Sequence, residues 1–201
     1  LDGIGTTEML HMFISNRPGR ARPGSCGQVV PGYRARIVTE SGAEAAAEEV
    51  GNLWVAGGSA FAGYWGKPEL TARVKQGEWV ITGDKFFRDA EGFYHYCGRA
   101  DDMLKVSGLW VSPVEVENTL LAHPGVAEAA VVGQRNAEGL TRIVAHVVLR
   151  ESAPGGEGLT EELRTFAKAR LPGYKCPQAV HYIDALPKTA TGKIQRFKLR
   201  N

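Results

Sequence analysis

Residues 103–117 read Met-Leu-Lys-Val-Ser-Gly-Leu-Trp-Val-Ser-Pro-Val-Glu-Val-Glu. Two short apolar runs flank Ser107-Gly108, a pair that is typical of a tight hairpin turn. Ser112 then offers a helix cap, Pro113 suits the first helical position, and Glu115 completes a capping box. The stretch therefore predicts a β-hairpin that runs directly into a capped helix.

The chain downstream alternates apolar, strand-like runs with one amphipathic segment. That segment places Leu163, Phe166 and Leu171 on one side and ends at Pro172-Gly173, as a helix does. The alternation predicts a compact α+β module of about 100 residues. Its expected parts are strands at 126–132, 141–149 and 179–183, a helix at 160–170, a polar turn at 135–140 and a flexible surface loop at 151–158.

The chain upstream of residue 99 is punctuated by Gly, Trp and Tyr. Short β-like runs separated by glycine turns predict a small antiparallel sheet or a distorted barrel. Pro68 stands in the first turn of a short helix candidate. The pattern changes at residues 99–102, so we expect two parts, residues 1–100 and 101–201. The expected elements of the first part are strands at 34–38, 51–56, 78–82 and 92–96 and a helix at 67–74.

The composition is that of a globular protein, with 43% hydrophobic and 23% charged residues. The net charge of +2 argues neither for nor against nucleic acid, but the basic residues form no stripe, and we expect no nucleic-acid partner. No apolar run approaches the roughly 20 residues of a membrane span. Cys26, Cys97 and Cys176 lie far apart without metal spacing, and we interpret them as reduced thiols of a cytoplasmic protein. The chain opens at Leu1 without an initiator Met, which suggests a piece of a longer protein.

One lysine near the C-terminus stands in a short polar loop. It is Lys193 in Pro-Lys-Thr-Ala-Thr-Gly-Lys-Ile-Gln-Arg, residues 187–196. A cation on such a loop can swing onto an anionic reacting centre and away again. The loop is not a phosphate-binding P-loop, because that pattern needs Gly where this chain has Pro187 and Ser or Thr where it has Ile194. The lysine therefore serves some other chemistry.

Residues 3–8, Gly-Ile-Gly-Thr-Thr-Glu, combine small residues, two hydroxyls and a carboxylate. They could present backbone N–H groups and Thr hydroxyls to a phosphate, with Glu8 holding Mg²⁺. The stretch is not a dinucleotide fingerprint, because Glu8 stands where the third Gly would be. The plain alternative is a turn followed by a helix cap.

Two further stretches carry candidate carboxylates. Residues 79–84 place Asp84 just past a predicted strand end, where it could accept both hydroxyls of a ribose or serve as an ordinary turn residue. Residues 98–102 are either a functional junction or a charged linker with an ion pair.

The histidines are spread out without a triad or ligand spacing, and we interpret four of them as structural: His95, His123, His146 and His181.

The order of these motifs resembles the acyl-adenylate-forming superfamily of AMP-binding enzymes, which holds acyl- and aryl-CoA ligases, carrier-protein adenylation domains and beetle luciferases. The sequences DGIGTTEMLHMFISN and KVSGLWVSPVEVE look most like those of benzoate-CoA and 4-hydroxybenzoate-CoA ligases. The resemblance implies an α+β chain that ends such an enzyme: the β-rich end of the large domain, then the mobile C-terminal domain. The motifs, in order, are GxTTE, GNLWVAGGSAFAGYWGKPE, WVITGD, GRADDMLKVSGLWVSPVEVE and PKTATGKIQR.

The resemblance implies a nucleotide site. Thr7 would touch the α-phosphate, Glu8 would hold Mg²⁺, and Asp84 with Arg99 would bind the ribose hydroxyls. Lys193 would bridge the attacking carboxylate and the α-phosphate, where a cation offsets the repulsion between two anions. The implied catalytic residues are Lys193, Thr7 and Glu8, and the implied nucleotide-binding residues are Gly5, Thr6, Thr7, Asp84, Arg99 and Lys193.

The resemblance also implies a moving domain and a tunnel. Asp101 matches a hinge, and one orientation about it would deliver Lys193 for acyl-adenylate formation. The other would bring up the hairpin to shape a pantetheine tunnel, in which Gly108 leaves the passage wide. The tunnel residues would be Ser107, Gly108, Leu109 and Trp110.

An acid pocket is implied next to the first motif, where glycines leave room for a flat aromatic ring. Its residues would be Gly3, Ile4, Gly5, Leu10 and His11. The sequence departs from the family at Ile4, where an aromatic residue often stands, so stacking on adenine from that position is not expected. A second departure is Asn52, which replaces the usual Glu of a GELW run and which we interpret as surface variation.

The implied reaction joins ATP, an aromatic carboxylate and coenzyme A into an aryl-CoA, AMP and pyrophosphate through an aryl-adenylate. The family's phosphate loop and most of its acid pocket would lie upstream of Leu1, in a missing N-terminal domain, so we expect the chain alone to be inactive. The alternatives are an adenylation domain that loads a carrier protein, and a non-catalytic nucleotide-binding or packing module. A lysine acetyltransferase and a deacetylase acting on Lys193 are further implied partners, since acetylation would remove its charge.

Overall fold

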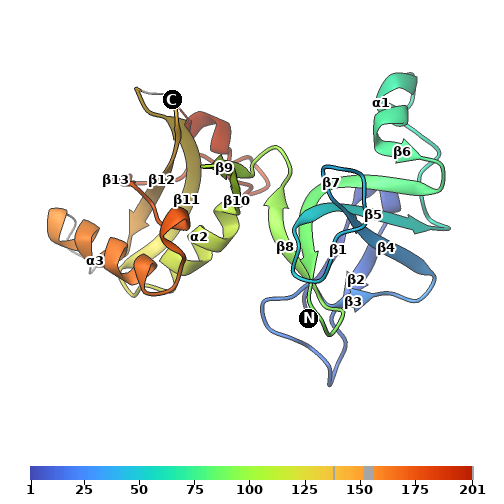
Figure 1. Ribbon diagram of the computed structural model, residues 1–201, viewed down its shortest axis with the longest axis horizontal. Coiled ribbons are helices and arrows are strands. Elements are labelled where there is room, and N and C mark those ends of the chain that lie inside the picture. The colour runs from blue at the N-terminus through green and yellow to red at the C-terminus, as the bar shows by residue number, and fades with distance from the viewer. Residues whose placement is uncertain (138, 152–155, 201) are drawn as a thin grey trace. The chain divides into compact units, whose positions relative to one another are not determined.

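The computed structural model describes residues 1–137, 139–151 and 156–200. The chain folds into two compact units, Leu1–Asp101 and Asp102–Asn201. Figure 1 follows the chain through both, from blue to red. Each unit has its own hydrophobic core, and each is described by itself.

The first unit is built from short antiparallel strands, as predicted. One sheet has the order β1-β2-β3, and a second has the order β4-β5-β7-β6 with β8 paired to β7. A 3₁₀ turn, η1 (Thr7–Met9), and a short helix, α1 (Pro68–Val74), complete the unit. The strands are β1 (Gly3–Gly5), β2 (Met12–Ser15), β3 (Gln28–Val29), β4 (Tyr33–Val38), β5 (Gly51–Gly57), β6 (Lys75–Gln76), β7 (Trp79–Arg88) and β8 (Tyr94–Arg99).

The core of the first unit anchors the N-terminal motif. Met9 is fully buried at the end of η1, together with Phe13 of β2, Leu53 of β5 and Phe86 of β7. Burying a side chain of that size stabilises the fold by about 1.5–3 kcal/mol. The segment that carries Thr7 and Glu8 is therefore fastened to the sheet by the residue that follows it, and η1 packs against β7.

The strand β7 runs further than the sequence predicts. It continues through Asp84 to Arg88, so Asp84 lies inside the strand and not just past its end. Gly83, with φ at +75°, lets the strand bend. Asp84 then lies opposite Arg99 of β8 in the antiparallel pair. The predicted strand at 92–96 likewise begins only at Tyr94 and extends to Arg99. The extension of β7 also pairs with β5, at Gly51 with Phe86 and at Asn52 with Lys85, and local periodicity does not register such pairing.

The second unit opens with the predicted hairpin and helix. Strands β9 (Leu104–Val106) and β10 (Leu109–Val111) pair antiparallel, and both turn residues have positive φ, +50° at Ser107 and +83° at Gly108. Positive φ at both positions is what a type I′ turn requires. Helix α2 (Pro113–Leu121) follows, with Ser112 Oγ accepting from Glu115 N at 3.1 Å. The Glu115 carboxylate, predicted to complete the capping box, accepts from Lys175 Nζ at 2.7 and 2.8 Å.

A mixed sheet forms the rest of the second unit. Strand β11 (Val126–Arg135) pairs antiparallel with β12 (Thr141–Leu149), and β13 (Ala179–Tyr182) pairs parallel with β12. Helix α2 packs along β11, and α3 (Glu157–Lys168) packs against α2, so the helices share one face of the sheet (Figure 1). The 3₁₀ turns η2 (Gly173–Lys175) and η3 (Arg196–Leu199) complete the unit.

The largest boundary differences in the second unit are at β11 and α3. Strand β11 extends to Arg135, into the predicted polar turn. Helix α3 begins at Glu157, so the last two residues of the predicted surface loop are helical, whereas residues 152–155 lie outside the described residues. The α+β character of the unit is as predicted.

Three further observations concern membrane-spanning helices, the cysteines and clusters of metal-binding side chains. No helix in the described part of the chain is long and apolar enough to cross a membrane. The three cysteines form no disulfide in the described structure; Cys97 and Cys176 are buried and Cys26 is half-buried. Among residues 1–137, 139–151 and 156–200, no three His, Cys, Asp or Glu side chains gather as a metal site would require.

Candidate functional site

The loop that follows β5 holds η1 in place. Ser59 Oγ donates to the carbonyl oxygen of Met9 at 2.7 Å, and Phe61 N donates to the carbonyl oxygen of Glu8 at 2.8 Å. Thr6, just before η1, is extended, so Thr7 and Glu8 stand on a short, tethered turn. The loop of the second motif, residues 51–69, therefore holds the turn of the first motif, residues 3–8, by hydrogen bonds.

Glu8 has one specific partner on that loop. The Tyr64 hydroxyl donates a 2.6 Å hydrogen bond to Glu8 Oε1. Partial burial acts to raise the pKa of the Glu8 carboxyl, but hydrogen bonds, that of Tyr64 foremost, outweigh burial and hold the pKa below its ordinary value. The same bond raises the pKa of Tyr64 to about 12. Glu8 is thus an oriented carboxylate that stays ionised at neutral pH.

Asp84 and Arg99 face each other across β7 and β8. Asp84 is buried, and Arg99 Nη1 lies 3.3 Å from its Oδ1 and donates to the carbonyl oxygen of Thr82 at 3.1 Å. Burial raises the pKa of Asp84, and the Arg99 charge opposes that rise. A Cβ on Gly83 would come within 2.9 Å of Arg99 Nη2, so the glycine leaves room for the guanidinium.

Arg99 also joins two motifs that lie far apart in the sequence. Its charge lowers the pKa of Glu8 as well as that of Asp84, which places the guanidinium within electrostatic reach of both carboxylates. Since η1 packs against β7 and Tyr64 bonds to Glu8, the first four motifs converge in the first unit. We call this group the Arg99 cluster: Thr6, Thr7, Glu8, Tyr64, Asp84 and Arg99.

The Arg99 cluster fits a magnesium–nucleotide complex. Mg²⁺ in phosphate-transfer sites is commonly bound by one or two carboxylates together with substrate phosphates and water, and it does not need a complete protein cage. The Glu8 carboxylate, whose pKa is lowered, is an oxygen donor of the type that such sites use. Thr6 Oγ1 is buried without a hydrogen-bond partner of good geometry in the described structure, although it is near enough to help stabilise the Glu8 carboxylate. An unpaired buried hydroxyl favours an additional polar ligand.

The predicted acid-pocket residues lie on β1 and just after η1. The glycines of β1 have an internal reason, because a Cβ on Gly5 would lie 2.6 Å from the carbonyl oxygen of His11 and one on Gly3 would lie 2.6 Å from Met12 Sδ. His11 Nε2 lies 3.0 Å from the Tyr33 hydroxyl, and Leu10 is exposed. The close strand approach accounts for both glycines by itself, so room for an aromatic ring stays a prediction.

Lys193 lies in the second unit, on an exposed loop that closes on itself. Lys188 and Ile194 form an isolated β-bridge across its base, and Thr189 N donates to the carbonyl oxygen of Lys193 at 2.8 Å. Gly192, with φ at +82°, makes the tight turn. The Lys193 ammonium has no ion pair or hydrogen bond with a described residue of its unit, so the charge is presented to solvent on an ordered backbone.

The predicted tunnel residues form the tip of the β9–β10 hairpin. Ser107, Gly108 and Leu109 are exposed, and Lys105 Nζ lies 5.2 Å from the centroid of the Trp110 ring. A Cβ on Gly108 would meet nothing within 4 Å, so inside this unit the glycine is required by its positive φ and not by crowding. A role in keeping a tunnel open stays a prediction.

The hinge candidate Asp101 ends the first unit. Its side chain is exposed, and Arg99 Nε lies 3.7 Å from its Oδ1. Asp101 thus stands next to the Arg99 cluster at the junction of the units.

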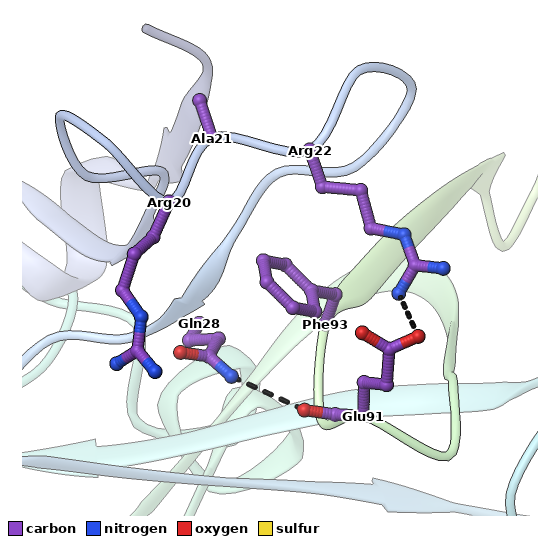
Figure 2. Close-up of a pocket in the computed structure, with 6 residues that line it drawn as sticks. All are labelled: Arg20, Ala21, Arg22, Gln28, Glu91 and Phe93. Atoms are coloured by element: carbon purple, nitrogen blue, oxygen red, sulfur yellow. Dashed lines mark hydrogen bonds and ion pairs between the residues drawn. The ribbon is translucent and has the colours of Figure 1, made fainter.

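A separate hollow of about 510 Å³ lies beside the turn between β7 and β8 (Figure 2). Arg22 lies over the Phe93 ring there, and its Nη1 lies 3.0 Å from Glu91 Oε1 and 2.9 Å from Asp89 Oδ2. Arg22 is therefore already neutralised within the fold. The hollow contains none of the predicted site residues; it is lined by Arg20, Ala21, Arg22, Gln28, Glu91 and Phe93.

Comparison with known proteins assigns the family. Residues 1–65 match the AMP-binding enzyme family, and residues 115–193 match the AMP-binding enzyme C-terminal domain. The chain belongs to the AMP-binding enzymes. It is 51% identical to the benzoate–CoA ligase of Thauera aromatica over its whole length, which corresponds to 38% of that protein.

Solved structures of other AMP-binding enzymes have the same fold. The anthranilate CoA ligase AuaEII, in complex with anthranoyl-AMP, matches 98% of this chain with a TM-score of 0.94 and 47% identity. A benzoate CoA ligase from Burkholderia xenovorans LB400 matches all of it with a TM-score of 0.92 and 49% identity. The chain spans 38% of the first of these proteins and 40% of the second.

Two features of this AMP-binding enzyme chain escaped the sequence reasoning. Tyr64 lies inside a quoted motif, but nothing in its spacing shows that its hydroxyl reaches Glu8. Glu117 is a buried carboxylate on α2, where an apolar residue is the ordinary expectation. A signal for Glu117 was present, since helical spacing places it on the same face as Leu120 and Leu121, where a charged residue needs a partner.

Proposed function

We propose that this chain is the C-terminal part of an ATP-dependent aryl-CoA ligase that forms benzoyl-type thioesters. In the first half-reaction an oxygen of the aromatic carboxylate attacks the α-phosphorus of ATP, and pyrophosphate leaves. In the second the thiol sulfur of coenzyme A attacks the carbonyl carbon of the aryl-adenylate, AMP leaves, and the thiol proton is released. The observation that carries the proposal is the Arg99 cluster, which brings four separate motifs to one place.

The Arg99 cluster supplies the nucleotide-binding part of this chemistry. The buried Asp84 carboxylate accepts the ribose hydroxyls, and Arg99 orients it from across the strand pair. Thr6 and Thr7 donate their hydroxyls to the α-phosphate. Glu8, oriented by Tyr64, would hold Mg²⁺, which supplies charge neutralisation on the phosphates when it is bound.

Lys193 supplies the mobile charge. The attacking carboxylate and the α-phosphate are both anionic, so a cation placed between them stabilises the transition state more than it stabilises the separated reactants. An ammonium at the tip of an ordered, exposed loop is suited to be delivered and withdrawn. Asp101 is proposed as the hinge, and Ser107 to Trp110 as the hairpin that serves the thioester-forming orientation.

The choice of an aryl acid and of coenzyme A rests on the relatives. The Thauera aromatica relative is a benzoate–CoA ligase, and the two structural relatives act on anthranilate and benzoate. The aromatic acid is proposed to lie against β1, where Gly3 and Gly5 carry no side chain. Gly3, Ile4, Gly5, Leu10 and His11 are proposed to line one side of that acid.

The test uses the intact parent protein. Acid-dependent pyrophosphate release is measured with benzoate, hydroxybenzoates and aminobenzoates, with and without coenzyme A. Lys193→Ala should lower the adenylation rate by a factor on the order of 10²–10³. Lys198→Ala is the matched control, because Lys198 is another exposed lysine of the C-terminal segment and lies near the Phe197 ring.

Each outcome separates the alternatives. Release that is driven by aryl acids, accelerated by coenzyme A and lost in Lys193→Ala supports the aryl-CoA ligase. Release without acyl transfer to coenzyme A would instead indicate an enzyme that loads a carrier protein. An intact protein that binds ATP but releases no pyrophosphate with any acid would be a non-catalytic module.

A regulatory role for Lys193 follows from its exposure. Acetylation of the ammonium would remove the charge that the adenylation step uses. Acetylated enzyme should therefore lose adenylation and recover it after treatment with a deacetylase. Failure to recover, with the acetyl group shown by mass spectrometry to be gone, would count against this regulation.

A further inference from the structure

A buried carboxylate in the second unit has no place in the chemistry described so far. Glu117 lies on α2 with its side chain 7% exposed, and its Oε1 accepts from Val131 N of β11 at 2.8 Å. A buried carboxylate is costly to desolvate unless it is well paired. The charged partner of Glu117 lies in the C-terminal segment.

Arg196 pairs with Glu117 through two nitrogens. Arg196 Nη2 donates to Glu117 Oε2 at 2.7 Å, and Nε donates to Oε1 at 3.1 Å. A two-pronged guanidinium–carboxylate pair fixes direction as well as distance. Because replacing a buried ion pair with apolar residues is often neutral or stabilising, this pair is better explained by the geometry that it imposes than by a gain in stability.

The same arginine reaches the entry to the unit. Arg196 Nη1 lies 3.5 Å from Asp102 Oδ2, and Arg200 Nη2 donates to Asp102 Oδ1 at 2.6 Å. Asp102 is the first residue of the second unit and follows the hinge candidate Asp101. The residue at which the chain enters the unit is therefore tied to the segment at which the chain ends. We call Glu117, Arg196, Asp102 and Arg200 the Glu117 network.

Lys193 lies three residues before Arg196, so the Glu117 network holds the C-terminal end of its loop. The N-terminal end is held as well, because Lys188 Nζ lies 2.5 Å from Glu128 Oε2 on β11. Glu117 and Glu128 thus hold the two ends of the Lys193 loop against the same strand, Glu117 through its bond to Val131 N. Between these ends the loop has its own hydrogen bonds, so its backbone has little freedom to shift.

We propose that Glu117 and Arg196 are positioning residues for Lys193, and that Asp102 locks this arrangement to the chain that enters the unit. The inference rests on the proposed role of Lys193 in adenylation. In this arrangement the Lys193 loop moves together with α2 and β11 as one body. Rotation at Asp101 then delivers the ammonium at a set position instead of releasing it on a loose tail.

The experiment compares the two half-reactions in the intact protein. Adenylation is followed by acid-dependent pyrophosphate release, and thioester formation by the consumption of supplied aryl-adenylate with coenzyme A. Glu117→Gln retains an oxygen for Val131 N but loses the charge that holds Arg196. We expect adenylation kcat to fall roughly 10- to 100-fold, since a misplacement of about 1 Å can have an effect of that size, while the KM for ATP and the thioester half-reaction change little.

Two further variants guard against a simple loss of folding. Arg196→Lys retains the positive charge and leaves the bond between Glu117 and Val131 in place, so it should show the same split between half-reactions at a smaller amplitude. Lys198→Gln changes a charge in the same 3₁₀ turn outside the Glu117 network and should leave both half-reactions unchanged. In a double variant, Glu117→Gln with Arg196→Gln, the loss should be no larger than in Glu117→Gln alone if the two residues act as a unit.

A readout without catalysis keeps this inference separate from the proposed function. Amide hydrogen exchange over residues 189–195 should speed up in Glu117→Gln and Arg196→Lys, while exchange in β12 stays slow. If the wild type releases no pyrophosphate, the proposed function fails and loop exchange alone decides on positioning. Equal losses in both half-reactions, or loop exchange unchanged from wild type, would overturn the positioning role.

Discussion

The Tyr64 hydroxyl donates a 2.6 Å hydrogen bond to Glu8 Oε1, across 56 positions of sequence. The bond joins the loop after β5 to the turn that carries the proposed magnesium ligand. It orients one carboxylate oxygen and leaves the other for a cation. Because the bond favours the carboxylate and the neutral phenol together, it moves the pKa of Glu8 down and that of Tyr64 up.

Replacing Tyr64 should weaken magnesium-dependent adenylation. Tyr64→Phe removes the hydroxyl but retains the ring, and we expect the adenylation rate of the intact protein to fall about tenfold, which corresponds to a hydrogen bond to a charged group of about 1.5 kcal/mol. The Mg²⁺ concentration needed for half-maximal rate should rise. Tyr174→Phe, at an exposed tyrosine of η2, is the control. An unchanged Mg²⁺ requirement in Tyr64→Phe would exclude a role for Tyr64 in holding Glu8.

The Tyr64 phenol should lose its proton at a higher pH than a free phenol does. Its pKa is raised to about 12, against about 10 for a free phenol, so the stability that the bond supplies is complete below about pH 10 and is lost as pH rises through about 12. The difference in ultraviolet absorbance between wild type and Tyr64→Phe should stay small up to about pH 11. With Glu8→Gln in both proteins that difference should appear near pH 10. Equal titration in the two backgrounds would contradict the coupling.

Asp84 should prove more important for binding than for stability. Burial raises its pKa, so holding the ionised form in the free protein is unfavourable, and Asp84→Asn removes that strain while leaving the half-exposed Arg99 solvated. We expect the melting temperature to stay level or rise slightly, and ATP affinity to fall about 10- to 100-fold as charged acceptors for the ribose are lost. Calorimetric titration with ATP and thermal unfolding measure the two effects. A large loss of stability with unchanged ATP affinity would assign Asp84 a structural role.

Gly83 offers a test of the space that Arg99 occupies. Gly83 and Gly77 both have positive φ, but only at Gly83 would a Cβ meet another group, Arg99 Nη2 at 2.9 Å. Gly77→Ala should destabilise the fold by about 1–2 kcal/mol from backbone strain alone. Gly83→Ala should destabilise it more and should also weaken ATP binding, because it displaces the guanidinium. Urea unfolding of both variants, with ATP titration, checks this, and equal effects would show that the contact is unimportant.

His146 should make the second unit sensitive to acid. Burial, with the His181 ring 5.4 Å away between centroids, lowers the pKa of His146 below its ordinary value of about 6.5. A lowered pKa means that the stability is fully present above about pH 6.5 and is lost as pH falls through the lower folded pKa. The urea midpoint should therefore decrease from pH 7 to pH 5 in wild type and much less in His146→Gln. His181→Gln, which removes only the neighbouring ring, should reduce the slope less; identical slopes in all three would refute this origin.

Short-range features were predicted well because their causes are local. The positive φ values of Ser107 and Gly108 and the cap at Ser112 follow from turn and helix chemistry within a few residues. The two fold classes of the halves followed from the change of hydrophobic pattern near residue 99. Predictions failed where the cause was distant: the predicted strand ended before Asp84, whereas β7 continues because it pairs with β5 as well as with β8.

The sequence by itself determined the family, the order of the motifs and the residue types available for chemistry. These are a lysine at 193, a carboxylate at 8, and a carboxylate and a guanidinium at 84 and 99. Only the tertiary structure decided which of them meet and what holds them. Tyr64 reaches Glu8, and Glu117 pairs with Arg196, through contacts between segments far apart in the chain. The physical reason is that hydrogen bonds and ion pairs act over a few ångströms in space, and packing, not sequence spacing, sets those distances.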